Sequence, residues 1–179
     1  YEHFLTNIIK KYNPKFYGVS SRCNNWLKHF NIEANGVFYN SIDGEAYKKY
    51  KDLYFSAVDS NKITICFAGR IIKEKGIDML ISAFNKLNKE YDNIKLLIAG
   101  EGPLKKELED SNKNPNIQFL GKLRYDEVMS LYNSSDIFAH PSMFPEGLPT
   151  TILEAGSMKC AIVATDRGGT IEVINDKKY

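Results

Sequence analysis

The chain has 179 residues, of which 43% are hydrophobic and 26% are charged; this composition is typical of a globular protein and excludes a disordered chain. Its 24 Lys and Arg residues against 22 Asp and Glu residues leave a net charge of +2, so nucleic acid is not an expected partner and an anion has to be bound by a local site. No apolar run approaches the roughly 20 residues of a membrane-spanning helix, and the three widely spaced cysteines indicate buried thiols in a reducing compartment, not a disulfide framework or a zinc site.

The first quarter of the chain is predicted to be the tail of a preceding α/β unit, because a helix, a strand, a helix and a strand follow one another. The four segments are FLTNIIKK, KFYGVS, SRCNNWLKHF and NGVFYN. The first helix has an apolar stripe beside two lysines, which fits a membrane-surface helix or a helix packed on its own sheet; the second is commoner and we favour it. Because the chain has no initiator Met and stops at INDKKY, we interpret it as part of a longer protein.

From residue 46 onward, helices and strands are predicted to alternate, as they do in parallel sheets. Strands are expected at 63–68, 94–100, 116–121, 136–140 and 161–165, and helices at 46–58, 77–89, 103–110, 125–135 and 149–159. The strand segments are nearly continuous apolar runs, which indicates burial on both faces of the sheet. We therefore predict a doubly wound α/β domain with a Rossmann-like parallel sheet.

Glycine and charged residues follow four of the predicted strands. These loops contain Gly69-Arg70, Gly100 to Pro103, the stretch FPEGLPTT at 144–151, and Asp166 to Gly169. The carboxyl ends of parallel strands meet at one edge of the sheet, where ligands bind in open α/β folds. Glycine lets main-chain N–H groups approach a ligand, and the free N–H groups at helix starts favour anions. We therefore expect a phosphate-binding site along this edge.

Two cations and two carboxylates stand out in these loops. Arg70 and Lys75 supply the positive charge that a departing diphosphate requires. Glu146 and Glu154 flank a predicted helix start at Pro149, where the first N–H groups are free. Carboxylates accept hydrogen bonds from neighbouring hydroxyls, so two of them around a phosphate site fit a nucleotide sugar. The alternative interpretation is structural, with surface cations, a solvated Glu146 and a Glu154 that caps or pairs on the helix surface.

Two other patterns at this edge carry less weight. Gly100 and Gly102 begin like the dinucleotide-binding motif G-x-G-x-x-G, but its third position is Lys105, which argues against a nicotinamide cofactor. His140 ends a predicted strand beside Pro141 and could point into the site, but a hydrogen-bonded structural histidine is the commoner case and we favour it. The sequence has no D-x-D motif and no cluster of His, Cys and Asp at metal-ligand spacing, so neither a metal nor a cofactor is expected.

Taken together, the motifs resemble those of the donor-binding half of retaining glycosyltransferases of family 4, which have the two-Rossmann architecture called GT-B. The resemblance covers roughly residues 35–179 and rests on Gly69-Arg70, Lys75-Gly76, Gly100 to Pro103, Glu146-x7-Glu154 and Gly168-Gly169. It implies transfer of a hexose, with retention, from a UDP- or GDP-sugar to a hydroxyl of a glycan or lipid-linked acceptor. It also implies a role in polysaccharide or glycolipid synthesis. The protein would be cytoplasmic and could associate peripherally with the inner face of the membrane.

The resemblance also implies individual roles. Arg70 and Lys75 would bind the donor diphosphate and Glu146 would contact the transferred sugar, and these three form the expected catalytic set. Glu154 would hold the ribose hydroxyls, and the residues near Lys122 would meet the base. The full set of expected substrate-binding residues is Gly69, Gly102, Lys122, Leu123, Gly147, Leu148, Pro149, Thr150 and Glu154.

The same resemblance suggests a domain division. Residues 1–42 would be the tail of the acceptor-binding domain and the hinge, and residues 43–179 a nucleotide-sugar-binding domain that is incomplete at its C-terminal end. The hinge carries Asn40-Ser41 where the family usually has Asn-Gly. Because the cleft between two domains completes such a site, we expect this piece alone to be inactive. The alternatives are a nucleotide-sugar epimerase with the same two-domain fold and a non-catalytic nucleotide-sugar-binding module.

Overall fold

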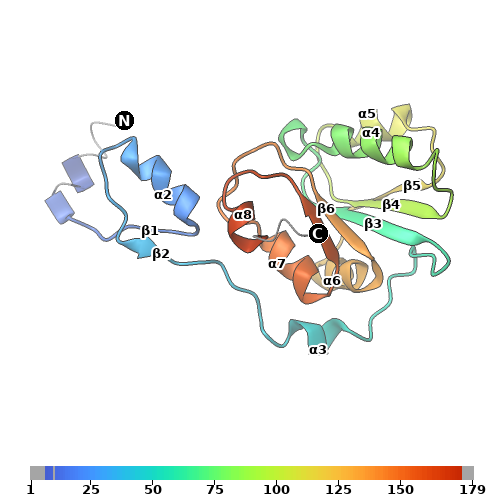
Figure 1. Cartoon of the computed structure of the whole chain (residues 1–179), viewed down its shortest axis with the longest axis horizontal. Coiled ribbons are helices and arrows are strands. Elements are labelled where there is room, and N and C mark those ends of the chain that lie inside the picture. Colours follow the sequence, from blue (N-terminus) through green and yellow to red (C-terminus); the bar gives the residue numbers. More distant parts are fainter. Residues whose placement is uncertain (1–6, 10, 175–179) are drawn as a thin grey trace.

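The computed structural model describes residues 7–9 and 11–174, and within them the chain forms two parallel sheets (Figure 1). The smaller sheet pairs β1 (Tyr17–Gly18) with β2 (Gly36–Val37), and α2 (Ser21–Lys28) connects the two strands. The larger sheet has five parallel strands in the order β5-β4-β3-β6-β7. The helix expected at the start of the chain lies partly outside the described residues.

The five-stranded sheet is the predicted doubly wound sheet. Its strands are β3 (Ile63–Ala68), β4 (Ile94–Ala99), β5 (Ile117–Gly121), β6 (Ile137–His140) and β7 (Ala161–Ala164). Within this sheet, the first strand in the sequence is the central strand β3. The next two strands, β4 and β5, extend the sheet on one side of β3, and β6 and β7 extend it on the other side. The loops after β3 and β6 therefore diverge at a topological switch point, which is where open α/β sheets bind ligands.

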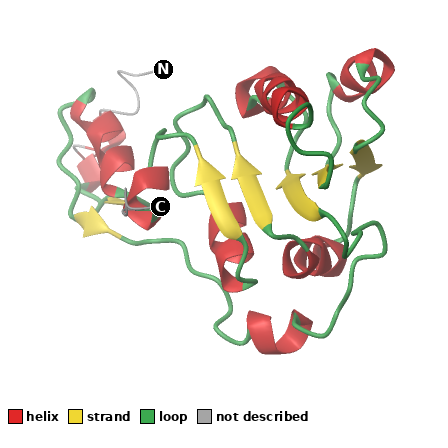
Figure 2. Ribbon diagram, turned by 45° about the vertical axis from the view of Figure 1, so that its right-hand side comes forward, coloured by secondary structure: helices red, strands yellow, loops and turns green. Residues whose placement is uncertain are grey.

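Helices cover both faces of this sheet, as Figure 2 shows. One face carries α4 (Ile77–Leu87) and α5 (Lys105–Ser111), and the other carries α3 (Ala46–Tyr50), α6 (Tyr125–Ser134) and α7 (Thr150–Ser157). Successive residues of a strand point to opposite faces, and accordingly Phe67 belongs to the core under α4 while Cys66 belongs to the core under α6 and α7. The last element of the described residues is the short helix α8 (Thr170–Val173).

Several helix boundaries differ from the prediction; α4, for example, ends at Leu87 and not at residue 89, and α5 begins at Lys105 and not at residue 103. The helix expected over 46–58 ends at Tyr50, because the side-chain amide of Asn133 donates to the carbonyl oxygens of Lys51 and Leu53, at 3.0 and 2.9 Å, and holds the chain in another path. Pro149 has an extended backbone and precedes α7, whose first residue is Thr150. In the described part of the chain, no helix is both long and apolar enough to cross a bilayer.

Candidate functional site

Three loops converge at the carboxyl edge of the five-stranded sheet, after β3, β6 and β7. The main-chain N–H of Met143 donates to the carbonyl of Glu74 at 2.8 Å, which joins the loop after β6 to the loop after β3. Gly76 has a left-handed φ of 65°, and a Cβ there would lie 2.3 Å from the carbonyl oxygen of Pro141. The two loops are thus packed backbone to backbone, and only glycine fits at this position.

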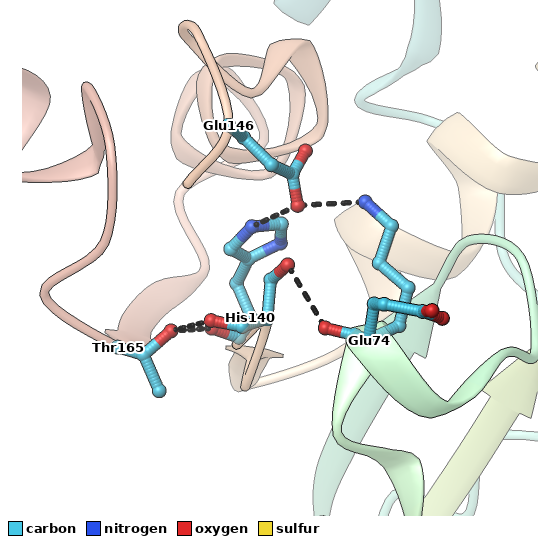
Figure 3. Close-up of polar contacts among 6 residues, drawn as sticks. Glu74, His140, Glu146 and Thr165 are labelled. Atoms are coloured by element: carbon cyan, nitrogen blue, oxygen red, sulfur yellow. Dashed lines mark hydrogen bonds and ion pairs between the residues drawn. The ribbon is translucent and has the colours of Figure 1, made fainter. Parts of the chain in front are cut away.

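The carboxylate of Glu146 lies at the centre of the converging loops (Figure 3). Its Oε1 accepts a hydrogen bond from Nζ of Lys75 at 2.7 Å, and both side chains are only about one-fifth exposed. Nε2 of His140 lies 3.2 Å from the same oxygen, close but not aligned as a hydrogen bond. Burial by itself raises the pKa of Glu146, but the neighbouring His140, Lys75 and Ser142 side chains outweigh burial and lower the pKa to about 2. Glu146 is therefore ionised at neutral pH.

Two glycines after β7 fix the loop that carries Glu146. Gly168 has a φ of 55°, and a Cβ there would lie 1.8 Å from the carbonyl oxygen of Glu146. The N–H of Gly169 donates to that carbonyl at 2.9 Å, and a Cβ on Gly169 would lie 1.8 Å from the carbonyl oxygen of Gly147. Any side chain at these positions would displace the Glu146 backbone, which explains the Gly168-Gly169 pattern physically.

A hollow of about 490 Å³ opens beside this carboxylate, and we call it the donor hollow. Its wall contains Arg70, Ile72, Glu74, Lys75, Phe144, Glu146 and Gly147. Arg70 is exposed, and within residues 7–9 and 11–174 its guanidinium forms no ion pair. The hollow therefore contains a guanidinium that is available for an anion and a carboxylate that is already neutralised by Lys75. Arg70, Lys75 and Glu146, the expected catalytic set, come together here.

A second hollow of about 440 Å³ lies at the ends of β3, β4 and β5, and it shares Arg70 with the donor hollow. Its wall contains Gly69, Gly100, Lys122, Leu123 and Val128. Gly100 has a φ of 140°, and a Cβ there would lie 1.8 Å from the carbonyl oxygen of Gly69. The structure thus brings Gly69, Lys122 and Leu123, three of the expected substrate-binding residues, around one hollow next to Arg70.

Five of the expected residues line neither hollow, namely Gly102, Leu148, Pro149, Thr150 and Glu154. A Cβ on Gly102 would lie 2.2 Å from the carbonyl oxygen of Ile71, so this glycine lets the loops after β3 and β4 pack together. Glu154 lies inside α7 and is only partly exposed. Burial raises its pKa. The pKa values of Tyr125 and of the buried Tyr132 in α6 are raised mainly by burial and in smaller part by the charge of Glu154, so the carboxylate lies near α6.

The remaining expected residues form the turn before α7. Gly147 lines the donor hollow, whereas Leu148 and Pro149 are buried. The carbonyl of Leu148 accepts a hydrogen bond from the side-chain amide of Asn40 at 2.9 Å. Thr150 is the exposed first residue of α7, so its N–H is one of the free donors at the helix start. This turn therefore offers main-chain donors at one point of the site edge.

His140 is the residue that the sequence interpretation undervalued. It was predicted to be structural, and its side chain is indeed only 4% exposed, but it faces the carboxylate of Glu146. Its position at the last residue of β6, beside the switch point, was the available signal. Over the described residues, no group of three His, Cys, Asp or Glu side chains is placed to hold a metal ion.

A parallel α/β sheet with cations, a neutralised carboxylate and free helix-start N–H groups at its switch point is typical of α/β proteins that bind anionic ligands at this edge. The chain belongs to the family described as "Glycosyl transferases group 1", whose model matches residues 48–179.

Two curated relatives illustrate this membership. An uncharacterized glycosyltransferase of Methanocaldococcus jannaschii is 34% identical over 98% of this chain and 47% of its own length. The capsular polysaccharide biosynthesis glycosyltransferase CapM of Staphylococcus aureus is 27% identical over 79% of this chain and 37% of its own length. The chain thus spans less than half of each of these relatives.

Solved structures show the same fold. HepE of Anabaena, in complex with UDP and glucose, superposes with a TM-score of 0.78 at 21% identity and covers 96% of this chain and 50% of that one. WaaG, a glycosyltransferase involved in lipopolysaccharide biosynthesis, gives a TM-score of 0.73 at 20% identity over 90% of this chain and 47% of that one. The five-stranded region is therefore the Rossmann-like C-terminal half of a GT-B fold.

Proposed function

We propose that the whole protein is a retaining hexosyltransferase of glycosyltransferase family 4 that uses a UDP- or GDP-sugar. The observation that carries this proposal is the donor hollow, which Arg70 and Glu146 both line and where Lys75 neutralises Glu146 at 2.7 Å. The similarity to a structure in complex with UDP and glucose supports a nucleotide-sugar donor. The similarity to a capsular polysaccharide enzyme supports a glycan or lipid-linked acceptor.

The donor diphosphate would lie between Arg70 and the first turn of α7. The guanidinium of Arg70 can hold two phosphate oxygens at once, and the ammonium of Lys75 has three N–H groups, of which one binds Glu146. The free N–H groups at the start of α7 add a partial positive charge. Positive groups on two sides of the diphosphate are what a departing anion requires.

The transferred sugar would bind next to Glu146. Because the pKa of Glu146 is about 2, its carboxylate stays ionised and accepts hydrogen bonds from sugar hydroxyls. The base and ribose would occupy the hollow lined by Lys122 and Leu123, with Glu154 as the acceptor for the ribose hydroxyls. This arrangement orders the base, ribose, diphosphate and sugar along the sheet edge from β5 to β6.

The chemical step follows from this placement. The bond between the anomeric carbon and the phosphate oxygen breaks, and its electron pair leaves with the diphosphate. The acceptor oxygen forms the new bond on the same face of the sugar, and its hydroxyl proton passes to the departing phosphate oxygen. Arg70, Lys75 and the start of α7 stabilise the charge that develops on that oxygen, which is where differential binding lowers the barrier.

The two parts of the chain would belong to different domains of the whole protein. Residues 1–42 would belong to the acceptor-binding domain and hinge, and residues 43–179 to the donor domain. Since the site is completed in the cleft between two domains, we expect the whole protein, and not this piece alone, to turn over. The three cysteines are free thiols, which suits a cytoplasmic protein, and a lipid-linked acceptor would bring it to the inner face of the membrane.

A paired substitution in the whole protein tests the proposal. Lys75→Met should lower kcat/KM with the cognate nucleotide sugar by about 100-fold or more, because it removes charge that stabilises the transition state. Lys73→Met is the matched control, since Lys73 lies in the same short helical turn, is exposed and does not line the donor hollow. Equal activity of the two variants would contradict the site assignment.

The product distinguishes the rival activities. NMR of the glycoside should show the same anomeric configuration as the donor; an inverted product would refute retention. Isomerised donor sugar without transfer would identify an epimerase, and tight UDP or GDP binding without any turnover would identify a binding module.

A further inference from the structure

We propose that the acceptor of this transfer is an acidic carbohydrate, and that it binds in a hollow between α2 and the loops after β6 and β7. This inference rests on the proposed function. The hollow has a volume of about 760 Å³, and we call it the acceptor hollow. The lining residues that matter for the argument are Arg22, Trp26, Phe144, Glu146, Asp166 and Arg167.

The acceptor hollow adjoins the donor hollow. Phe144 and Glu146 line both of them, so a molecule in one meets a molecule in the other at the Glu146 carboxylate. A hydroxyl of the acceptor can therefore reach a sugar held at Glu146 without any further channel. The second hollow at the ends of β3, β4 and β5 shares only Arg70 with the donor hollow, which places the base at the opposite end from the acceptor.

Two aromatic side chains give the acceptor hollow its apolar surface. Trp26 is 67% exposed and Phe144 is 57% exposed. The ring of Trp26 is held by an edge contact with Phe30, whose centroid lies 4.8 Å away. Rigid, exposed aromatic faces bind ligands at a low entropic cost, and the C–H face of a pyranose ring is a flat apolar surface of matching size. The aromatic pair therefore fits a carbohydrate.

The charges of the acceptor hollow leave one cation unmatched. Asp166 pairs with Arg22 at 3.0 Å, and Glu146 pairs with Lys75 of the donor hollow at 2.7 Å. Arg167 is exposed, and its guanidinium has no ion-pair partner in the described part of the chain. Guanidinium groups bind carboxylates and phosphates in a two-pronged geometry. The acceptor should therefore carry such a group.

The backbone holds Arg167 in a fixed place. Its N–H donates to the carbonyl of Thr165 at 2.9 Å, and its carbonyl accepts from Thr170 at 3.2 Å. The next residue, Gly168, is the glycine that packs against Glu146. The position of Arg167 is thus coupled to that of the Glu146 backbone, and a single anionic substituent on the acceptor would fix the distance between its hydroxyl and the donor sugar.

The test compares acceptors and variants in the whole protein. Matched glycosides that are neutral, that carry a uronic acid carboxylate or that carry a phosphate are assayed with the cognate donor. One acidic class should have an acceptor KM at least about tenfold below that of the neutral glycoside, and the difference should shrink as salt rises. The acidic glycoside with the lower acceptor KM shows whether the acceptor carries a uronate or a phosphate.

The variants assign the effect to residues. Arg167→Gln should remove the preference for the acidic glycoside, by raising its KM about tenfold with the donor KM unchanged. Trp26→Ala should raise the KM of neutral and acidic acceptors alike. Two variants are the controls. Lys86→Gln removes an exposed cation from the last turn of α4, and Tyr91→Ala removes an aromatic ring that is 54% exposed. Both should leave the preference for the acidic glycoside and the KM of the acceptors unchanged.

The outcomes separate this inference from the proposed function. If the protein hydrolyses or transfers from a nucleotide sugar but uses neutral and acidic acceptors equally well, the proposed function stands and this inference is wrong. The inference is also wrong if Arg167→Gln keeps the acidic preference while its melting temperature and UDP or GDP affinity match the wild type. If no nucleotide sugar is bound or used, the proposed function itself fails and takes this inference with it.

Discussion

The region around α2 and the five-stranded region differ in what they bury. The five-stranded sheet has a hydrophobic core on each face, with fully buried side chains such as Phe67 and Phe138. In contrast, α2 has no buried residue, and aromatic side chains of its region are exposed, among them Trp26 at 67% and Phe38 at 78%. One region thus carries its own core, whereas the other depends on contacts with its neighbour.

The contacts between the two regions are mostly polar, and they converge on the loops that build the site. Arg22 of α2 pairs with Asp166 after β7, and the side chain of Asn40 donates to the carbonyl of Leu148 before α7. Interfaces of this kind between parts of a chain are weak and permit relative motion. The donor hollow is thus formed by loops of the five-stranded region alone, whereas the acceptor hollow lies at the joint between the two regions.

The largest effect should come from the core of the five-stranded region. Phe138→Ala removes a fully buried ring whose centroid lies 5.2 Å from that of Tyr132, and it should lower the free energy of unfolding by about 3–5 kcal/mol. Trp26→Ala removes a larger but exposed ring and should change it by less than about 0.5 kcal/mol. Urea denaturation of the 179-residue chain measures both. A similar loss in the two variants would show that the α2 region has a core of its own.

The next effect should come from the glycine that supports Glu146. In Gly168→Ala, the new Cβ would lie 1.8 Å from the carbonyl oxygen of Glu146 at a φ of 55°, so the free energy of unfolding should fall by about 1–3 kcal/mol. Because Glu146 is displaced, kcat of the whole protein should fall by about 100-fold. Gly156→Ala is the control: it lies in α7 with no atom within 4 Å of the new Cβ, and it should stabilise by about 0.5–1 kcal/mol. Unchanged kcat in Gly168→Ala would separate Glu146 from the reaction.

The sequence predicted the five-stranded region well, because the apolar patterns that indicate its strands and helices are local. The apolar runs at 63–68 and 94–100 became β3 and β4 almost residue for residue. The approach of Arg70, Lys75 and Glu146 followed from a general property of parallel sheets, whose carboxyl strand ends share one edge. No pairwise contact had to be known for that step.

The parts that escaped prediction depend on contacts between distant residues. The helix expected over 46–58 stops at Tyr50 because Asn133, some 80 positions away, binds the following carbonyls. The side chain of His140 faces Glu146 because of the path of the loop between them, and the acceptor hollow needs α2 beside the loop after β7. Periodicity and spacing describe single elements, so they contain no information about such pairs.

A smaller effect should show that burial of the ionised Glu154 carboxylate destabilises the folded chain. Burial raises the pKa of its carboxyl, so the folded chain binds that proton more tightly than the unfolded chain, and stability falls as pH rises from the unfolded value of about 4.5 through the folded pKa. Glu154→Gln cannot ionise, so its melting temperature should match the wild type near pH 4 and exceed it by about 1–3 °C at pH 7–8. A difference that does not vary with pH would mean that the carboxylate is well solvated.

The smallest effect should come from the carboxylate that joins the two regions. Glu172 of α8 accepts hydrogen bonds from the main-chain N–H groups of Ser21 and Arg22, at 2.9 and 3.0 Å, at the start of α2. Burial raises the pKa of Glu172, but these main-chain hydrogen bonds, together with the hydroxyls of Ser21 and Tyr39, outweigh burial and lower it. The contribution of ionised Glu172 to stability is therefore present at a pH above the unfolded-state pKa of about 4.5, and it is lost as pH falls through the lower folded-state pKa.

Removing that charge should loosen α2 alone. Because Glu172 is only partly buried, Glu172→Gln should weaken the contact by only about 0.3–0.5 kcal/mol at pH 7. Amide hydrogen exchange of Ser21–Lys28 should then accelerate about twofold while exchange in β3 and β4 stays unchanged. Glu33→Gln, an exposed carboxylate near the same region, is the control and should change neither. If exchange in α2 is unaffected, or if β3 and β4 accelerate as well, then Glu172 does not hold α2 specifically, and the joint beside the acceptor hollow must be held by other contacts.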